Sequence, residues 1–260
     1  MRGSKLEKLA KMKYSLPYWE SDYYIRKLTE QLEGIDRESR ILDVGCGDGR
    51  FTMMLLDLGF SEVCALDSNL DSLLELENQL VNRGATDKVV PVHASASDLP
   101  FQDSYFDVIL SIGVFYYLND GYEDALNEIA RVLSRGGVLL ETEPDQVGSA
   151  VKGLVFDGLD SFLRIVKEHK FLEYFDGEPL ELRCFNVQEM HQLHEEVGMP
   201  VREMEAISLF PSLLTIGRKK NIIRDIDKID VLEDQIKEAF NILDGSSSLA
   251  KHKLWICKKT

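Results

Sequence analysis

The segment 41–50 constrains the fold of this chain more than any other part of the sequence. It reads Ile-Leu-Asp-Val-Gly-Cys-Gly-Asp-Gly-Arg, a short apolar strand with one acid followed by three alternating glycines. Glycine permits positive φ angles and lets a ligand approach the backbone closely. A strand that ends in such a turn and opens a helix presents free backbone N–H groups. The segment therefore predicts a nucleotide-type site at the carboxyl end of a parallel strand.

The spacing of the glycines narrows the choice of ligand. A dinucleotide-binding loop has the pattern Gly-x-Gly-x-x-Gly, and Arg50 stands where that pattern requires its last glycine. A Walker loop needs Gly-Lys followed by Ser or Thr, and this segment lacks that sequence. A nicotinamide-dependent dehydrogenase and a Walker-type nucleotidase are thereby disfavoured. A glycine-rich loop of an unrelated α/β protein stays open.

Strands and helices alternate after this point. We expect strands at 40–44, 62–66, 89–93, 105–111 and 138–142, with helices at 51–58, 69–82 and 122–133 between them. Because such alternation builds βαβ units, the region predicts a parallel sheet with right-handed crossovers.

The flanking segments are less regular. We expect Ser21 or Asp22 to cap a helix that ends at Leu32, and Asn186 to cap a helix over 187–197. The remaining predictions are helices at 6–12, 154–169 and 222–243, a polar and aromatic connector at 171–184, and strands at 201–209 and 253–258.

Acidic residues follow the second and third expected strands. Asp67 ends the second strand, 24 residues after Asp43, where a carboxylate can accept both hydroxyls of a ribose. The alternative is a helix N-terminal carboxylate beside Ser68. The third strand is followed by Ser97-Asp98-Leu99-Pro-Phe, which taken alone could be an Asx turn before proline.

The order and spacing of these motifs resemble the class I S-adenosylmethionine (SAM) methyltransferases, particularly the branch acting on small molecules, such as the quinone-biosynthesis enzymes. The resemblance is dense over 40–142 and weak over 187–209 and the last strand. It implies an α/β fold: a Rossmann-like, seven-stranded, mostly parallel sheet with helices on both faces, an antiparallel last strand and helical cap insertions. It also implies SAM as the cofactor.

The same resemblance assigns parts of the cofactor to parts of the chain. The glycine loop would hold the methionine half, Asp67 the ribose, the loop after the third strand the adenine, and the strand ending at Ser111 would lie under the transferred methyl group. The expected cofactor-binding residues are Asp43, Gly45, Cys46, Gly47, Asp67, Ser68, Ser97, Asp98, Leu99 and Ser111, with Tyr18 and Trp19 before the core. A sulfonium suits an aromatic wall, although Tyr18 and Trp19 could instead pack their helix on the sheet.

No residue is assigned as catalytic from the sequence. Methyl transfer from a sulfonium starts from an activated leaving group, so positioning and desolvation supply much of the acceleration. A base is needed only if the acceptor must lose a proton. The candidates are His169, Tyr174 and Tyr116, followed by Glu141, Glu143, His191 and His194. His191 and His194 could share a helix face, but no third ligand accompanies them, and no metal site is predicted.

The predicted organisation is one methyltransferase domain over residues 1–260. It would comprise an N-terminal helical lid at 1–34, a cofactor-binding core at 35–144, cap insertions at 145–185 and 209–250, and remaining core elements at 186–208 and 251–260.

Composition limits the partners and the compartment. A formal net charge of −15 argues against nucleic acid, since phosphate binding depends on clustered Lys and Arg. The four cysteines lack zinc spacing, which favours buried thiols in a reducing compartment and hence the cytoplasm. We expect no secretory signal and no membrane span, because no apolar run reaches the necessary length.

The sequence therefore predicts an enzyme, a SAM-dependent methyltransferase that acts on an O, N or C atom of a small or medium-sized acceptor. One alternative is a non-catalytic, methyltransferase-like scaffold that binds a nucleoside or a protein partner. Another is a peptide or protein acceptor, since an acidic surface could attract a basic substrate.

Overall fold

A computed structural model describes residues 18–175, 178–207 and 252–260 of the chain. The helices expected at 6–12 and 222–243, the first half of the lid at 1–34 and the cap insertion at 209–250 lie outside these ranges.

The core is a seven-stranded sheet with the order β3-β2-β1-β4-β5-β9-β8. Its strands are β1 (Arg40–Val44), β2 (Glu62–Asp67), β3 (Val89–His93), β4 (Phe106–Ile112), β5 (Leu133–Pro144), β8 (Val201–Ile207) and β9 (His252–Lys258). Strands β1 to β5 pair in parallel, whereas β9 runs antiparallel to both β5 and β8. The predicted sheet with its antiparallel last strand is confirmed.

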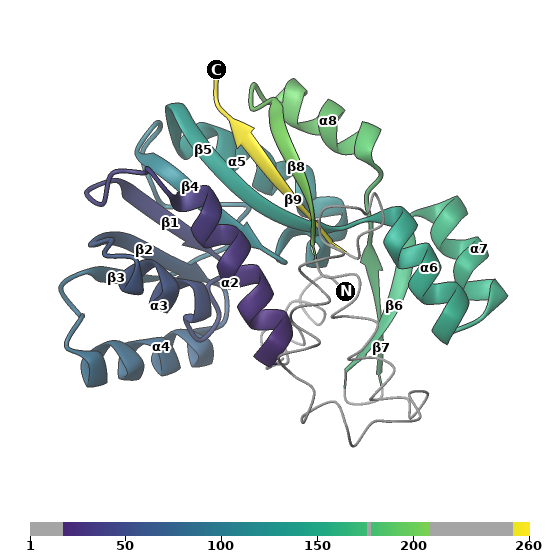
Figure 1. The fold of residues 1–260 in the computed structure, drawn as a ribbon, viewed down its shortest axis with the longest axis horizontal. Helices are drawn as coiled ribbons and strands as arrows, with labels where there is room; N and C mark the ends of the chain where they lie inside the picture. The colour runs from purple at the N-terminus through teal and green to yellow at the C-terminus, as the bar shows by residue number, and fades with distance from the viewer. Residues whose placement is uncertain (1–17, 176–177, 208–251) are drawn as a thin grey trace.

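Alternating strand residues build a hydrophobic core on each face of the sheet. On one face, Ile41 and Leu140 pack with residues of the helices α2 (Tyr18–Leu32), α3 (Arg50–Asp57) and α4 (Leu70–Arg83). On the other face, Leu42 and Leu139 pack with α5 (Tyr122–Val132) and α8 (Val187–Glu196). Successive strand residues point to opposite faces, so both sides of each central strand are buried. Helices on both faces are thus confirmed, and α2 crosses in front of the sheet in Figure 1.

Side-chain and glycine caps fix the ends of the predicted helices. The Asn69 side chain accepts from the backbone N–H of Asp71 and Ser72 at the start of α4, and Gly84 ends that helix with φ of 66°. The Asn186 side chain accepts from the Glu189 N–H at the start of α8. The cap at Asn186 is confirmed, whereas Asn69, expected as the first residue of its helix, instead caps it.

Three expected elements differ from the structure. Helix α2 begins at Tyr18, so neither Ser21 nor Asp22 caps it. The single helix expected at 154–169 is two helices, α6 (Gln146–Phe156) and α7 (Leu159–Glu168), separated at Gly158, whose φ is 94°. The expected connector at 171–184 is a hairpin of β6 (Lys170–Phe175) and β7 (Glu178–Arg183). The sequences of these two strands show no clear alternation of apolar and polar residues, so the hairpin could not be distinguished from a connector.

The segment 145–185 is an insertion that begins and ends at the carboxyl edge of the sheet. It follows β5, and its two ends meet where Phe185 N donates to Pro144 O over 2.9 Å and Gln146 N donates to Phe185 O over 2.8 Å. Figure 1 shows α6 and α7 beside the sheet rather than on either face. The expected helical cap is therefore half helix and half hairpin.

Candidate functional site

The glycine loop between β1 and α3 has the positive φ angles that its sequence permits. Gly45, Gly47 and Gly49 all have positive φ, at 68°, 56° and 97°. A Cβ on Gly45 would lie 2.5 Å from Val114 Cγ2, and one on Gly49 would lie 2.4 Å from Leu76 Cδ1. A Cβ on Gly47 would meet no atom of the described residues within 4 Å. Two of the glycines are thus required by packing, whereas Gly47 borders open space.

Asp67 connects the glycine loop to the start of α4. One carboxylate oxygen accepts from Gly47 N at 2.8 Å, and the other accepts from Asn69 N at 2.8 Å. Burial raises the pKa of Asp67, although the hydrogen bonds from these amides oppose the rise. The loop is tied to β2 a second time by Gly45 N and Cys46 N, which both donate to Leu66 O. The exposed Ser68 follows directly.

Asp43 lies beneath the loop instead of on its surface. Its carboxylate is fully buried and accepts from the Thr52 hydroxyl at 2.6 Å. Burial raises the pKa of Asp43 to about 7; the Thr52 hydrogen bond lowers it and the nearby Asp67 charge raises it further. Burial likewise raises the pKa of the neighbouring Cys46 thiol. A buried carboxyl poised to ionise near neutral pH therefore lies under the loop.

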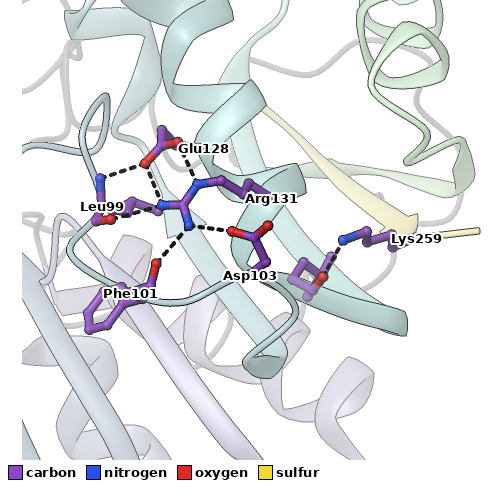
Figure 2. Close-up of polar contacts among 7 residues, drawn as sticks. Leu99, Phe101, Asp103, Glu128, Arg131 and Lys259 are labelled. Carbon is purple, nitrogen blue, oxygen red and sulfur yellow. Dashed lines mark hydrogen bonds and ion pairs between the residues drawn. The ribbon is translucent and has the colours of Figure 1, made fainter.

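Two residues of α5 hold the loop that follows β3 (Figure 2). Arg131 donates to Leu99 O at 2.9 Å, to Phe101 O at 2.7 Å and to both oxygens of Glu128 at 2.8 Å. Glu128 in turn accepts from Leu99 N at 2.8 Å. Leu99 is buried, while Ser97 is half-buried and Asp98 exposed. The paired side chains of Glu128 and Arg131, which we call the fork, thus fix the backbone of Leu99. The neighbouring Asp98 is left facing solvent.

The end of β4 is held by an acid from the neighbouring strand. Glu143 in β5 accepts from Phe115 N at 3.2 Å and from Tyr116 N at 2.9 Å, and these residues open the short 3₁₀ helix η1 (Phe115–Tyr117). Burial and the Glu141 charge raise the pKa of Glu143 well above its usual range. Ser111 is fully buried beneath this turn, and its hydroxyl has no hydrogen-bond partner among the described residues.

The sequence candidates for a base are dispersed by the fold. His169 Nδ1 lies 3.2 Å from Glu189 Oε2, and Tyr174 is 66% exposed on the hairpin. Glu141 and His194 are both buried and face each other at 2.8 Å, on the sheet face that packs against α8. His191 is exposed. Of these candidates, only Tyr116 and Glu143 lie at the carboxyl edge beside the glycine loop.

The described residues hold no cluster of three or more His, Cys, Asp or Glu side chains suited to a metal ion. No helix among them has the length and apolar character needed to cross a membrane. Tyr18 and Trp19 lie in the first turn of α2.

Sequence reasoning missed three residues of this edge: Tyr24, Arg131 and His252. His252 opens β9, and its Nδ1 lies 2.7 Å from the Tyr24 hydroxyl. These two residues are 228 positions apart, so no local pattern connects them. A signal for Arg131 did exist, in the Glu-x-x-Arg pair of a predicted helix, but its targets on the loop could not be inferred.

Comparison with known proteins places this geometry in a family. Residues 42–140 match the family model described as a methyltransferase domain. Over these residues the chain is therefore similar to a methyltransferase domain. The chain is 38% identical over 136 residues to the ubiquinone/menaquinone biosynthesis C-methyltransferase of Azotobacter vinelandii, covering 51% of this chain and 53% of that protein. The chain thus spans about half the length of the curated relatives that it matches.

Solved structures share the fold of the methyltransferase domain and of the elements around it. A SAM-dependent methyltransferase from Methanosarcina mazei has a TM-score of 0.63 at 19% identity, covering 89% of this chain and 96% of that one. The [4+2]-cyclase SpnF has a TM-score of 0.62 at 16% identity, covering 91% of this chain and 80% of that one. At such identities the likeness concerns the fold alone.

Proposed function

We propose that this chain is a SAM-dependent methyltransferase with a small-molecule acceptor. The observation that carries the proposal is Gly47, a glycine with φ of 56° whose Cβ position faces open space while its N–H is held by Asp67. The positive φ favours glycine at this position, and the space left beside it by the described residues gives a ligand room to approach the backbone of the loop.

The surrounding residues fit the cofactor in charge and in polarity. The amino and sulfonium groups of SAM are cationic, and the loop that would hold them has Asp43 below it and Asp67 beside it. Asp67 is already oriented by two backbone amides at 2.8 Å, so its orientation is fixed before a ribose arrives. The exposed Asp98 beside Leu99 suits an adenine amino group. We propose these contacts, with the exposed Ser68 and the half-buried Ser97 beside them and the buried Ser111 beneath the transferred methyl group.

When bound, SAM supplies a methyl group on a positively charged sulfur, which is a strong leaving group. The chain then has to orient the acceptor in line and exclude water. Glu143 contributes to that orientation by fixing the amides of Phe115 and Tyr116. The segment 145–185 leaves the sheet at the same edge, and we propose that it forms part of the acceptor side of a single domain.

The acceptor class is proposed from the relatives. The Azotobacter protein is named for ubiquinone and menaquinone biosynthesis and for C-methylation, so a quinone-type ring and a carbon atom are the first acceptor to test. We also propose a cytoplasmic location, supported by four free cysteine thiols, because disulfides persist in oxidising compartments.

A glycine pair tests cofactor binding at Gly47. Gly47→Ala and Gly84→Ala both place a Cβ at similar positive φ, 56° and 66°, with no atom within 4 Å in the part of the chain that the structure describes. We expect each to lower the free energy of unfolding by about 1–2 kcal/mol. Only Gly47→Ala should abolish S-adenosylhomocysteine binding in calorimetry, because Gly84 ends α4 away from the carboxyl edge. Equal affinity of both variants for the cofactor product would refute the proposal.

A second function is favoured by one observation. The [4+2]-cyclase SpnF has a similar fold, so this fold does not by itself fix the reaction. A scaffold or a cyclase would bind S-adenosylhomocysteine. When given SAM and a quinol acceptor, however, it would transfer no methyl group and would therefore form no S-adenosylhomocysteine. Release of S-adenosylhomocysteine with equimolar methylated quinol separates the methyltransferase from these alternatives.

A further inference from the structure

Exposed apolar side chains are concentrated on one part of the insertion, the helix pair α6–α7. The described residues include twelve large apolar side chains that are exposed, and six of them lie on these two helices. Scattered apolar residues are ordinary on a protein surface, whereas a cluster of them marks a binding surface. We call these six residues, each between 39% and 61% exposed, the apolar patch: Val147, Leu154, Val155, Leu159, Leu163 and Val166.

The patch consists of one stripe on each helix. Its residues stand at positions i, i+4 and i+7 in α7 and at positions i, i+7 and i+8 in α6, which is the spacing of a single helix face. The two helices contact each other through other atoms. A Cβ on Gly153 would lie 2.7 Å from Ile165 Cδ1, and Gln146 Nε2 donates to Val166 O over 3.1 Å. Packing between the helices therefore leaves the apolar stripes exposed.

Half of the patch lies at the end of the helix pair that is remote from the sheet. The insertion leaves the sheet after Pro144, and the far end of the pair is the turn at Gly158. Leu154, Val155 and Leu159 all lie within four residues of that turn. Figure 1 shows the helix pair at the outer side of the molecule, beside the sheet. The apolar residues thus gather at a projecting end, where an extended surface can contact several of them at once.

The charge of the helix pair indicates an uncharged partner. Residues 146–168 contain three cationic and three acidic side chains, whose formal charges cancel, although the whole chain has a net charge of −15. These side chains are Lys152, Arg164, Lys167, Asp157, Asp160 and Glu168. A basic protein or an anionic lipid is selected by a surface of opposite charge, and this helix pair has no net charge. A zwitterionic lipid surface, which is neutral overall and apolar beneath its headgroups, matches it.

We propose that the apolar patch docks this chain on the surface of a zwitterionic lipid bilayer, with the far end of α6–α7 entering the headgroup region. The inference rests on the proposed function, because a quinone-type acceptor is apolar and partitions into a bilayer rather than into water. The patch belongs to the segment 145–185, which we assign to the acceptor side, so docking brings that side to the lipid that dissolves the acceptor. Such docking needs no helix that crosses the bilayer, since apolar side chains on one face of a helix can lie in the interface.

The test measures co-sedimentation of the full chain with phosphatidylcholine vesicles that contain no acceptor. We expect the wild type to bind and the double variant Val155→Asp/Leu159→Asp to bind about tenfold more weakly or less, because two apolar side chains no longer enter the lipid. The matched control is Leu74→Asp/Val81→Asp on α4, where these side chains are 49% and 66% exposed. The control loses the same two residue types and gains the same charge, so it should bind as the wild type does.

Other occupants of the patch are outcomes of the same test. Equal vesicle binding by the two double variants, no binding by the wild type, or binding only to anionic phosphatidylglycerol vesicles overturns the inference. Sedimentation velocity without lipid should give the wild type and Val155→Asp/Leu159→Asp the same oligomeric state; a wild-type dimer that this variant dissociates would overturn the inference and make the patch an interface between two copies. All three proteins should bind S-adenosylhomocysteine equally, which shows that they are folded. Failure of the wild type to bind it would instead overturn the proposed function, whatever the result with vesicles.

Discussion

At the scale of single residues, Asp43 shows how burial changes an acid that the sequence presents as an ordinary motif residue. The ordinary pKa of the aspartate is 3.8, and burial raises it to about 7 in the folded chain. Between these values the folded state keeps a proton that the unfolded state loses. The stability contributed by this proton is therefore complete below about pH 4 and is lost as the pH rises through about 7.

Asp43→Asn should remove that pH dependence. Between pH 5 and pH 8, the wild type should lose about 2.5 kcal/mol more of its free energy of unfolding than the variant does, measured by urea denaturation at both pH values. Asp48→Asn, an exposed acid in the same loop, controls for the loss of a negative charge. If the free energy of unfolding changes with pH equally in wild type and Asp43→Asn, burial does not raise the pKa of the Asp43 carboxyl.

At the scale of elements, the loop after β3 depends on one helix. The loop has no regular structure to hold its backbone, and Arg131 compensates by bonding two of its carbonyls and the Glu128 carboxylate at once (Figure 2). Asp103 also accepts from Arg131, but it is 77% exposed, and exposed ion pairs contribute little. The carbonyl bonds and the half-buried Glu128 therefore carry the stabilisation.

Arg131→Lys should free this loop, because a single ammonium cannot reproduce the planar fork. We expect a loss of about 1–3 kcal/mol in the free energy of unfolding. Calorimetry should also show weaker binding of S-adenosylhomocysteine, because the loop after β3, where we propose that adenine binds, would lose its fixed backbone. Arg83→Lys is the comparison: its partner Asp57 is 68% exposed, so its loss should be under about 1 kcal/mol. Similar losses in both variants would contradict the role of the fork.

At the scale of the whole molecule, a buried polar cluster joins β5, α5 and α8. Glu141 accepts from the Tyr122 hydroxyl at 3.0 Å and faces His194 Nε2 at 2.8 Å, with Glu141 and His194 fully buried. Burial lowers the pKa of His194, but the Glu141 carboxylate offsets this and raises it well above the usual value. The pair fastens the helix before β8 to the centre of the sheet.

His194→Leu should leave the Glu141 charge buried without its cation and cost about 3–5 kcal/mol in chemical denaturation. Replacing both residues with Leu should cost clearly less than the single change, because two apolar side chains need no partner. His191→Leu, on the exposed side of the same helix, should change stability by under about 1 kcal/mol. A double variant as unstable as His194→Leu would argue against an ion pair.

The sequence by itself determined the sheet, the helices of residues 40–144 and the glycine loop. Strand and helix periodicity and the caps at Asn69 and Asn186 act over a few residues, and each can be read locally. The same local signals failed between 145 and 185, where the hairpin β6–β7 carries no alternation strong enough to distinguish it from a connector.

Only the tertiary structure decided which polar side chains work together. It buried Asp43, paired Glu141 with His194, bound Arg131 to the loop after β3, and brought His252 to Tyr24 across 228 positions. The physical reason is that a hydrogen bond depends on an approach within about 3 Å, and chain folding sets such distances independently of sequence separation. Local sequence therefore predicted where a cofactor could bind, while the approach of β9, α2 and η1 to one another was decided only by the fold.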